Sequence, residues 1–150
     1  YTASDHIRAL FNHSCPGLFD LCLVNDAPIP PSVMRGYTRE GAEPILCDRD
    51  ACEALGVEVI IATADGSAGL KGLVTDGMAA VSDYTYLYTC GPEPMLKAVY
   101  ADCKTSGQFS FEERMGCGFG ACMGCSCETK YGNKRICKDG PVLEKEEIVW

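Results

Sequence analysis

A chain of 150 residues, 47% of them hydrophobic, is long enough for one ordinary domain or for a small domain followed by a module. Its formal net charge of −8 argues against nucleic acid as a partner, and no apolar run is long enough to cross a membrane. Eleven cysteines, with no secretory signal at the start, favour a reducing, cytoplasmic setting. No Ser/His/Asp set or paired-carboxylate motif stands out, so nothing points to a hydrolase.

Predicted strands and helices alternate through the first two thirds of the chain. In chain order we expect a helix over 5–11 capped by Ser4, a strand over 18–24, a proline-rich loop over 26–32, a helix over 51–55 and a strand over 57–62. We then expect a helix over 70–82, a strand over 84–89 and a helix over 94–104. This alternation is typical of a parallel, doubly wound α/β sheet.

The character of the sequence changes near Gly107, because glycine, cysteine and charged residues become more frequent from there on. The predicted domains are therefore an α/β domain over 1–107 and a small module over 108–150. Within the module we expect a β-hairpin over 125–137 that turns at 131–133. The charged segment over 144–147 is expected to be solvated.

A run of cysteines in the module predicts a metal centre. Its candidate ligands are Cys117, Cys122, Cys125 and Cys137. The spacing Cys-x4-Cys-x2-Cys with a distant fourth cysteine is typical of a [2Fe–2S] cluster, and the surrounding glycines suit a loop that approaches the cluster closely. A zinc site usually pairs two Cys-x2-Cys knuckles, and only one is clean here; a disulfide framework fits poorly with an odd number of cysteines. Cys127 is expected to lie near the cluster without binding it.

Two shorter motifs follow predicted strands. The first comprises Thr63, Asp65, Gly66 and Ser67, and the second comprises Cys90, Gly91 and Pro92. Ligands of parallel α/β sheets bind at the carboxyl ends of strands, so the first motif could hold a ribose or phosphate and the second leaves room for a bound group. Plain structural turns would produce both motifs as well. The stretch 36–40 also offers a hydroxyl and a guanidinium, with a solvated loop as its default interpretation.

Four stretches together carry a family resemblance: 36–47, 59–76, 90–95 and 112–142. They resemble the electron-transfer subunit of the heteromeric, NAD-linked dihydroorotate dehydrogenases, a branch of the ferredoxin–NADP reductase superfamily. The resemblance implies that NADH gives a hydride to FAD, and that single electrons pass through a [2Fe–2S] cluster to the FMN of a separate catalytic subunit. That subunit interconverts dihydroorotate and orotate in pyrimidine biosynthesis.

The resemblance also assigns roles to residues. The cluster ligands would be Cys117, Cys122, Cys125 and Cys137. Thr63, Asp65, Gly66 and Ser67 would fall at the nucleotide, while Gly91 and Pro92 would lie near the contact of nicotinamide and flavin, with Cys90 in the catalytic position. The protein would position and tune these cofactors, since the redox chemistry belongs to them.

Two features depart from the family pattern. The flavin-binding β-barrel is absent from these residues, and the loop over 25–31 holds prolines where the family has glycines. The expected fold is therefore an incomplete ferredoxin-reductase-type parallel sheet followed by a C-terminal [2Fe–2S] module with a β-hairpin. Two alternatives remain: an electron-transfer subunit of another NAD(P)H-dependent ferredoxin or sulfide reductase, and a zinc-stabilised binding module without redox activity.

Overall fold

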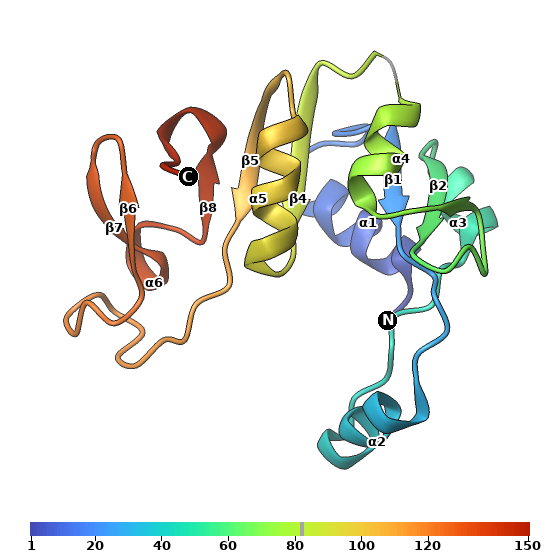
Figure 1. Ribbon diagram of the computed structural model, residues 1–150, viewed down its shortest axis with the longest axis horizontal. Coiled ribbons are helices and arrows are strands. Elements are labelled where there is room, and N and C mark those ends of the chain that lie inside the picture. Colours follow the sequence, from blue (N-terminus) through green and yellow to red (C-terminus); the bar gives the residue numbers. More distant parts are fainter. Residues whose placement is uncertain (82) are drawn as a thin grey trace. The chain divides into compact units, whose positions relative to one another are not determined.

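The computed structural model describes residues 1–81 and 83–150, and it divides into two compact units, Tyr1–Ala80 and Val81–Trp150 (Figure 1). The sequence instead placed a boundary near Gly107. The reason for the difference is a sheet that runs across that point, because strand β5 (Ser106–Ser110) pairs with β4 (Tyr86–Cys90) before it and with β8 (Val142–Glu144) after it. Residue 82, the expected end of one helix, lies outside the described residues.

The first unit is an α/β unit around a parallel sheet, as the alternating pattern predicted. Its elements are α1 (Ala3–His13), β1 (Leu21–Val24), α2 (Pro31–Glu40), α3 (Arg49–Glu53), β2 (Glu58–Thr63), β3 (Leu70–Lys71) and α4 (Val74–Ala80). The strand order is β1-β2-β3, and both pairings are parallel. The register sets Leu21 opposite Glu58 and Val24 opposite Ile61. Both of the longer strands thus end at the same edge of the sheet.

The N-cap of helix α1 lies two residues earlier than expected. Thr2 is the cap: its side chain accepts the N–H of Asp5, and the Asp5 carboxylate accepts the N–H of Thr2 at 3.0 Å. The predicted cap, Ser4, is buried inside the helix and donates its N–H and Oγ to Asp48, at 2.9 and 2.6 Å. The local sequence around Ser4 resembles that of a helix cap, because it does not show that the hydroxyl bonds to Asp48, 44 residues away.

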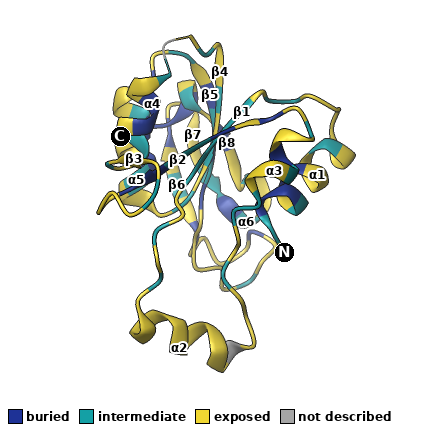
Figure 2. Ribbon diagram, turned by 90° about the vertical axis from the view of Figure 1, so that its right-hand side faces the viewer, coloured by how far each residue is buried: buried dark blue, intermediate teal, exposed yellow. Residues whose placement is uncertain are grey.

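Helix α2 and strand β3 were not predicted. The expected loop over 26–32 gives way to α2 at Pro31, whose fixed φ suits the first turn of a helix. Every residue over 31–39 is exposed, so the stretch that includes Gly36 and Arg39 is a solvated helix rather than a loop (Figure 2). The helix expected over 70–82 starts only at Val74, because Leu70 and Lys71 pair with the end of β2.

The second unit combines a three-stranded sheet with a hairpin. Its elements are β4 (Tyr86–Cys90), α5 (Glu93–Asp102), β5 (Ser106–Ser110), β6 (Ser126–Thr129), β7 (Gly132–Arg135), α6 (Ile136–Asp139), β8 (Val142–Glu144) and the 3₁₀ turn η1 (Lys145–Glu147). Strands β4 and β5 are parallel and joined through α5, whereas β8 lies antiparallel to β5. The hairpin of β6 and β7 confirms the predicted one.

Separate buried clusters support the two units. In the first unit the buried set comprises Ala3, Ile7, Cys52, Val57 and Val59. In the second unit the largest fully buried side chains are Phe109, Leu96, Ile136, Leu143, Ile148 and Val99. The ring of Phe109 also contacts Tyr100 and Trp150, with centroids 6.0 and 6.1 Å away. Each cluster packs helices against strands, and this packing holds in place the loops that connect them.

The segment over 144–147 is not a solvated tail. Glu144 belongs to β8, and Glu147 is buried with its carboxylate on the ammonium of Lys134. A charged side chain can be buried when a partner of opposite charge lies on another strand, which the local composition does not reveal. Within residues 1–81 and 83–150, no helix combines the length and apolar character needed to cross a membrane.

Candidate metal centre and neighbouring motifs

The loop before the hairpin turns its peptide N–H groups toward two cysteine sulfurs. The sulfur of Cys117 accepts the N–H of Ala121 at 3.2 Å and that of Cys122 at 3.5 Å. The sulfur of Cys122 accepts the N–H of Gly124 at 3.5 Å. Such donors stabilise negative charge on sulfur, which a metal-bound thiolate carries.

A second pair of cysteines is held at the base of the hairpin. Cys125 is buried just before β6, and its sulfur accepts the N–H of Cys137 at 3.4 Å. The carbonyl of Cys125 also accepts the N–H of Ile136 at 3.0 Å. The start of α6 is therefore bound directly to the residue that precedes β6, and Cys137 is presented beside Cys125.

The electrostatics of the thiols follow from these contacts. The N–H groups of Cys122 and Phe119 lower the pKa of Cys117 to about 6, and the thiol of Cys122 adds to the effect. The Cys125 side chain, together with burial and the charges of Cys125 and Cys117, raises the pKa of Cys137. The four sulfurs thus group as two pairs, Cys117 with Cys122 and Cys125 with Cys137. Among the side chains that the structure describes, no three from His, Cys, Asp or Glu are grouped as a site for one metal ion.

The loop that carries Cys117 and Cys122 uses unusual backbone conformations. Gly118 and Gly120 have φ values of +73° and +90°, and Met123, which is not a glycine, has a φ of +59°. Gly120 is also buried, and a Cβ there would lie 2.8 Å from Cδ of Lys138. This supports the expected role of glycine in letting the loop close tightly. A sulfur-rich donor set with inward N–H groups fits an iron–sulfur cluster.

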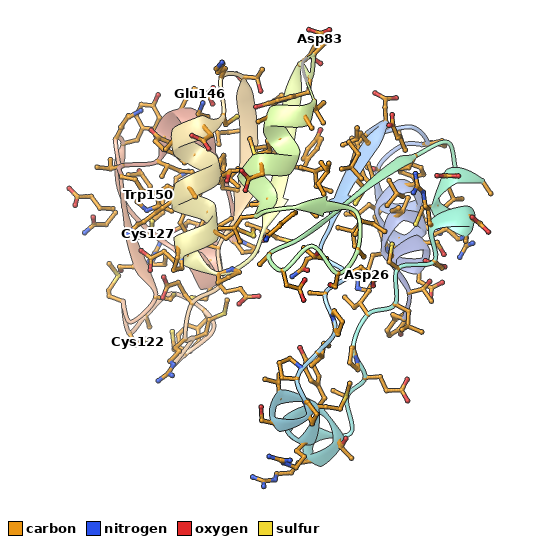
Figure 3. All side chains as sticks on the ribbon, turned by 45° about the vertical axis from the view of Figure 1, so that its right-hand side comes forward. Asp26, Asp83, Cys122, Cys127, Glu146 and Trp150 are labelled. Carbon is orange, nitrogen blue, oxygen red and sulfur yellow. The ribbon has the colours of Figure 1, made fainter. Side chains whose placement is uncertain are left out.

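Cys127 lies in strand β6 and faces a cavity. It lines a cavity of about 200 Å³ together with Glu93, Leu96, Phe111, Glu112, Glu113, Ser126, Glu128, Val149 and Trp150. Figure 3 shows it beside Trp150 and away from Cys122. Burial, followed by the charges of Glu113 and Glu147, raises the pKa of its thiol. Cys125 precedes β6, which begins only at Ser126, so the two cysteines do not lie on one strand.

The first nucleotide motif, in the first unit, closes on itself. The buried hydroxyl of Thr63 donates to the carbonyl of Ala68 at 2.8 Å and accepts its N–H at 3.2 Å. The carboxylate of Asp65 accepts the N–H and the hydroxyl of Ser67, at 3.0 and 2.7 Å, and these bonds lower its pKa. Gly66 supplies the turn with a φ of +79°. These side chains satisfy one another, as in an ordinary Asp-Gly turn.

The second motif, in the second unit, links β4 to α5. Cys90 is exposed at the end of β4, and Gly91 follows with a φ of +153°. Pro92 precedes the first residue of α5 and accepts the N–H of Met95 at 2.9 Å through its carbonyl. The structure thus places Cys90, Gly91 and Pro92 in the same unit as the four sulfurs, and Thr63, Asp65, Gly66 and Ser67 in the other unit.

One residue of the site was missed at the sequence level. Arg135 ends β7 and donates to the carbonyl of Gly120 at 3.1 Å, fifteen residues earlier in the chain. An arginine two residues before a predicted ligand is the only local sign of this role. Its partner could not be identified without the fold.

Known families match the two ends of the chain. Residues 112–149 match the model of the iron–sulfur cluster binding domain of dihydroorotate dehydrogenase B. Residues 1–64 match the model of 2-phospho-L-lactate transferase CofD, a stretch that runs from α1 to one residue past β2.

Curated relatives agree with the match at the C-terminal end. The electron transfer subunit of dihydroorotate dehydrogenase B (NAD(+)) from Geobacillus sp. strain WCH70 is 43% identical over 146 residues, covering 89% of this chain and 53% of that protein. The subunit from Shouchella clausii is 50% identical over 97 residues, covering 61% of this chain and 38% of that protein. This chain therefore spans about half, or less, of the length of these relatives.

A solved structure adds a likeness in fold. The structure of an NADH-dependent reduced ferredoxin–NADP oxidoreductase aligns with a TM-score of 0.61 and 28% sequence identity, covering 71% of this chain and 40% of that one. The α/β fold expected from the ferredoxin–NADP reductase superfamily thus has a structural counterpart.

Proposed function

Because residues 112–149 match the iron–sulfur cluster binding domain of dihydroorotate dehydrogenase B, we propose that the chain is an electron-transfer component of such an enzyme. Cys117, Cys122, Cys125 and Cys137 would hold a [2Fe–2S] cluster. The observation that carries the proposal is the grouping of the four sulfurs into two pairs, each with peptide N–H donors. Two pairs of thiolates suit two metal ions that share bridging sulfides.

The chemistry expected of this site is the transfer of single electrons, which a bound iron–sulfur cluster supplies. The residues of the chain hold the cluster and tune it. The N–H groups of Ala121, Gly124 and Cys137 favour negative charge on the sulfurs to which they donate. The exposure of Cys122 leaves one side of the site open toward a redox partner, whereas burial of Cys125 anchors the other.

The remaining assignments complete the proposed relay. NADH would supply electrons through FAD, and the acceptor would be the FMN of a dihydroorotate dehydrogenase catalytic subunit. Thr63, Asp65, Gly66 and Ser67 are proposed nucleotide contacts, although their present hydrogen bonds would have to rearrange. Gly91 and Pro92, with Cys90 in the catalytic position, are proposed to lie near the reacting nicotinamide and flavin. The reducing cytoplasm is the proposed location.

The test is anaerobic purification of the chain, followed by visible absorption, analysis of iron and acid-labile sulfide, and electron paramagnetic resonance after reduction. A brown protein with a reduced S = ½ signal is expected. Cys122→Ser should lose this signal, while Cys15→Ser, at an exposed thiol of the first unit, should retain it. A colourless protein that binds zinc, and that iron and sulfide cannot turn brown, would contradict the proposal.

The structural likeness to an NADH-dependent reduced ferredoxin–NADP oxidoreductase supports a second candidate, a subunit of another NAD(P)H-dependent reductase. The two candidate functions differ in the electron acceptor that the reduced chain should prefer. The reduced chain should reduce the FMN of a dihydroorotate dehydrogenase catalytic subunit rapidly and a ferredoxin slowly, and the reverse order would favour the second candidate.

A further inference from the structure

Arg135 connects the two halves of the metal centre. Its Nη1 donates to the carbonyl of Gly120, in the loop that carries Cys117 and Cys122, at 3.1 Å. Its Nε and Nη2 donate to the two carboxylate oxygens of Asp139, at 2.9 and 3.3 Å. Asp139 ends the short helix α6 that carries Cys137. The guanidinium of Arg135 is therefore bonded both to the loop that carries Cys117 and Cys122 and to the helix that carries Cys137.

The ion pair also fixes where the positive charge lies. The bidentate contact of a guanidinium with a carboxylate restricts both groups to one geometry. The carboxylate of Asp139 also accepts the backbone N–H of Arg135 at 3.0 Å. The side chains are about one quarter exposed, at 27% and 28%, so water screens their charges only in part.

Cysteines of the centre lie within electrostatic reach of Arg135. The Asp139 carboxylate raises the pKa of Arg135 most, and the negative charges of Cys137 and Cys125 raise it further. Of the ion pair, the guanidinium is the member that bonds directly to the loop that carries Cys117 and Cys122, through the carbonyl of Gly120.

We propose that Arg135 sets the reduction potential of the cluster, with Asp139 as the residue that positions it and partly offsets its charge. The inference rests on the proposed function, because it requires a cluster on the four cysteines. An electron that enters the cluster makes it more negative, and a fixed cation nearby stabilises that state. No bond forms or breaks at Arg135 and no proton moves, because a guanidinium stays protonated throughout.

Opposite charge changes at the two residues test the proposal. Arg135→Gln removes the positive charge and should lower the midpoint potential, whereas Asp139→Asn removes the negative charge and should raise it. Arg135→Lys keeps the charge without the planar fork and should fall between Arg135→Gln and wild type. Lys130→Gln, at the opposite end of the hairpin, makes the same change in net charge and should shift the potential least.

The measurement is a dye-mediated redox titration of the full chain, followed by visible absorption and electron paramagnetic resonance. Equal potentials in all variants, or shifts of Arg135→Gln and Asp139→Asn in the same direction, would overturn the proposal, because a purely structural role gives no opposite signs. If Arg135→Gln does not retain a cluster, the midpoint potentials of Arg135→Lys and Asp139→Asn still test the proposal, because they should shift in opposite directions from wild type. A wild-type chain without any cluster would instead contradict the proposed function.

Discussion

Lys134 on β7 and Glu147 in η1 form an ion pair that ties the hairpin to the segment after β8. Glu147 is the more buried partner, with a side chain that is 10% exposed against 32% for Lys134. The same carboxylate accepts the N–H of Glu144 at 3.0 Å. One acidic side chain thus stabilises both the turn that contains it and the hairpin beside the candidate metal centre.

Replacing Glu147 by Ala should destabilise the second unit. The change leaves the half-buried ammonium of Lys134 and the N–H of Glu144 without their partner, which should cost about 1–3 kcal/mol in free energy of unfolding. Urea denaturation followed by tryptophan fluorescence measures this, because Trp150 packs on Phe109 and Phe111 in the same unit. Glu112→Ala, at an exposed glutamate of that unit, is the control, and an equal loss there would refute the assignment.

Replacing Gly120 by Ala should weaken cluster retention. The new Cβ would meet Cδ of Lys138 at 2.8 Å and would have to adopt a φ of +90°. Gly132→Ala is the matched control, because φ is +102° there and nothing lies within 4 Å of the new Cβ. Both variants carry backbone strain of about 1–2 kcal/mol, and only Gly120→Ala adds a collision beside the site. Iron content per chain after gel filtration should fall for Gly120→Ala alone.

The stability of the first unit should depend on pH through Asp48. Hydrogen bonds from the hydroxyl and the N–H of Ser4 hold the pKa of this carboxyl well below its ordinary value. A lowered folded-state pKa stabilises the fold at pH values above the unfolded pKa of about 4, and this contribution is lost as the pH falls further. Wild type should therefore exceed Asp48→Asn in urea midpoint at pH 7, and the gap should narrow below pH 4. A gap that stayed constant with pH would mean that the charge is irrelevant.

A control for this prediction lies two residues away. Asp50→Asn changes an exposed carboxylate in the first turn of the same helix, α3, and lacks the contact with Ser4. Its difference from wild type should vary less between pH 7 and pH 3 than that of Asp48→Asn.

In the metal-free chain, Cys117 should react faster than Cys137 with iodoacetamide at pH 7. The thiolate is the reactive form, and Cys117 with a pKa of about 6 is mostly ionised there, whereas the pKa of Cys137 is raised. The difference in rate should shrink as the pH rises and the Cys137 thiol ionises as well. Peptide mass spectrometry after timed labelling measures the two rates, and faster labelling of Cys137 at pH 7 would contradict the described hydrogen bonds.

The sequence predicts what depends on local pattern. The cysteine spacing located a loop whose N–H groups do point at sulfur, and the turn near Gly132 located the hairpin. The sequence-based predictions were wrong where a residue's role depends on a partner distant in sequence. Ser4 bonds to Asp48 instead of capping a helix, and Glu147 pairs with Lys134 instead of being solvated. Short strands such as β8 have too few residues to show a period, so the sheet across Gly107 could not be foreseen.

The order in which this chain is synthesised bears on how its candidate metal centre would be filled. The hairpin beyond Cys125 is attached to the sheet by later residues: Ile148 bridges to Thr129, and the carbonyl of Glu147 accepts the N–H of Lys130 at 2.9 Å. On the ribosome, the cysteines emerge before those residues do. Loading of iron into a fixed site would therefore follow the synthesis of Glu147 and Ile148, and thiols of the nascent chain that are exposed before then would need protection from oxidation.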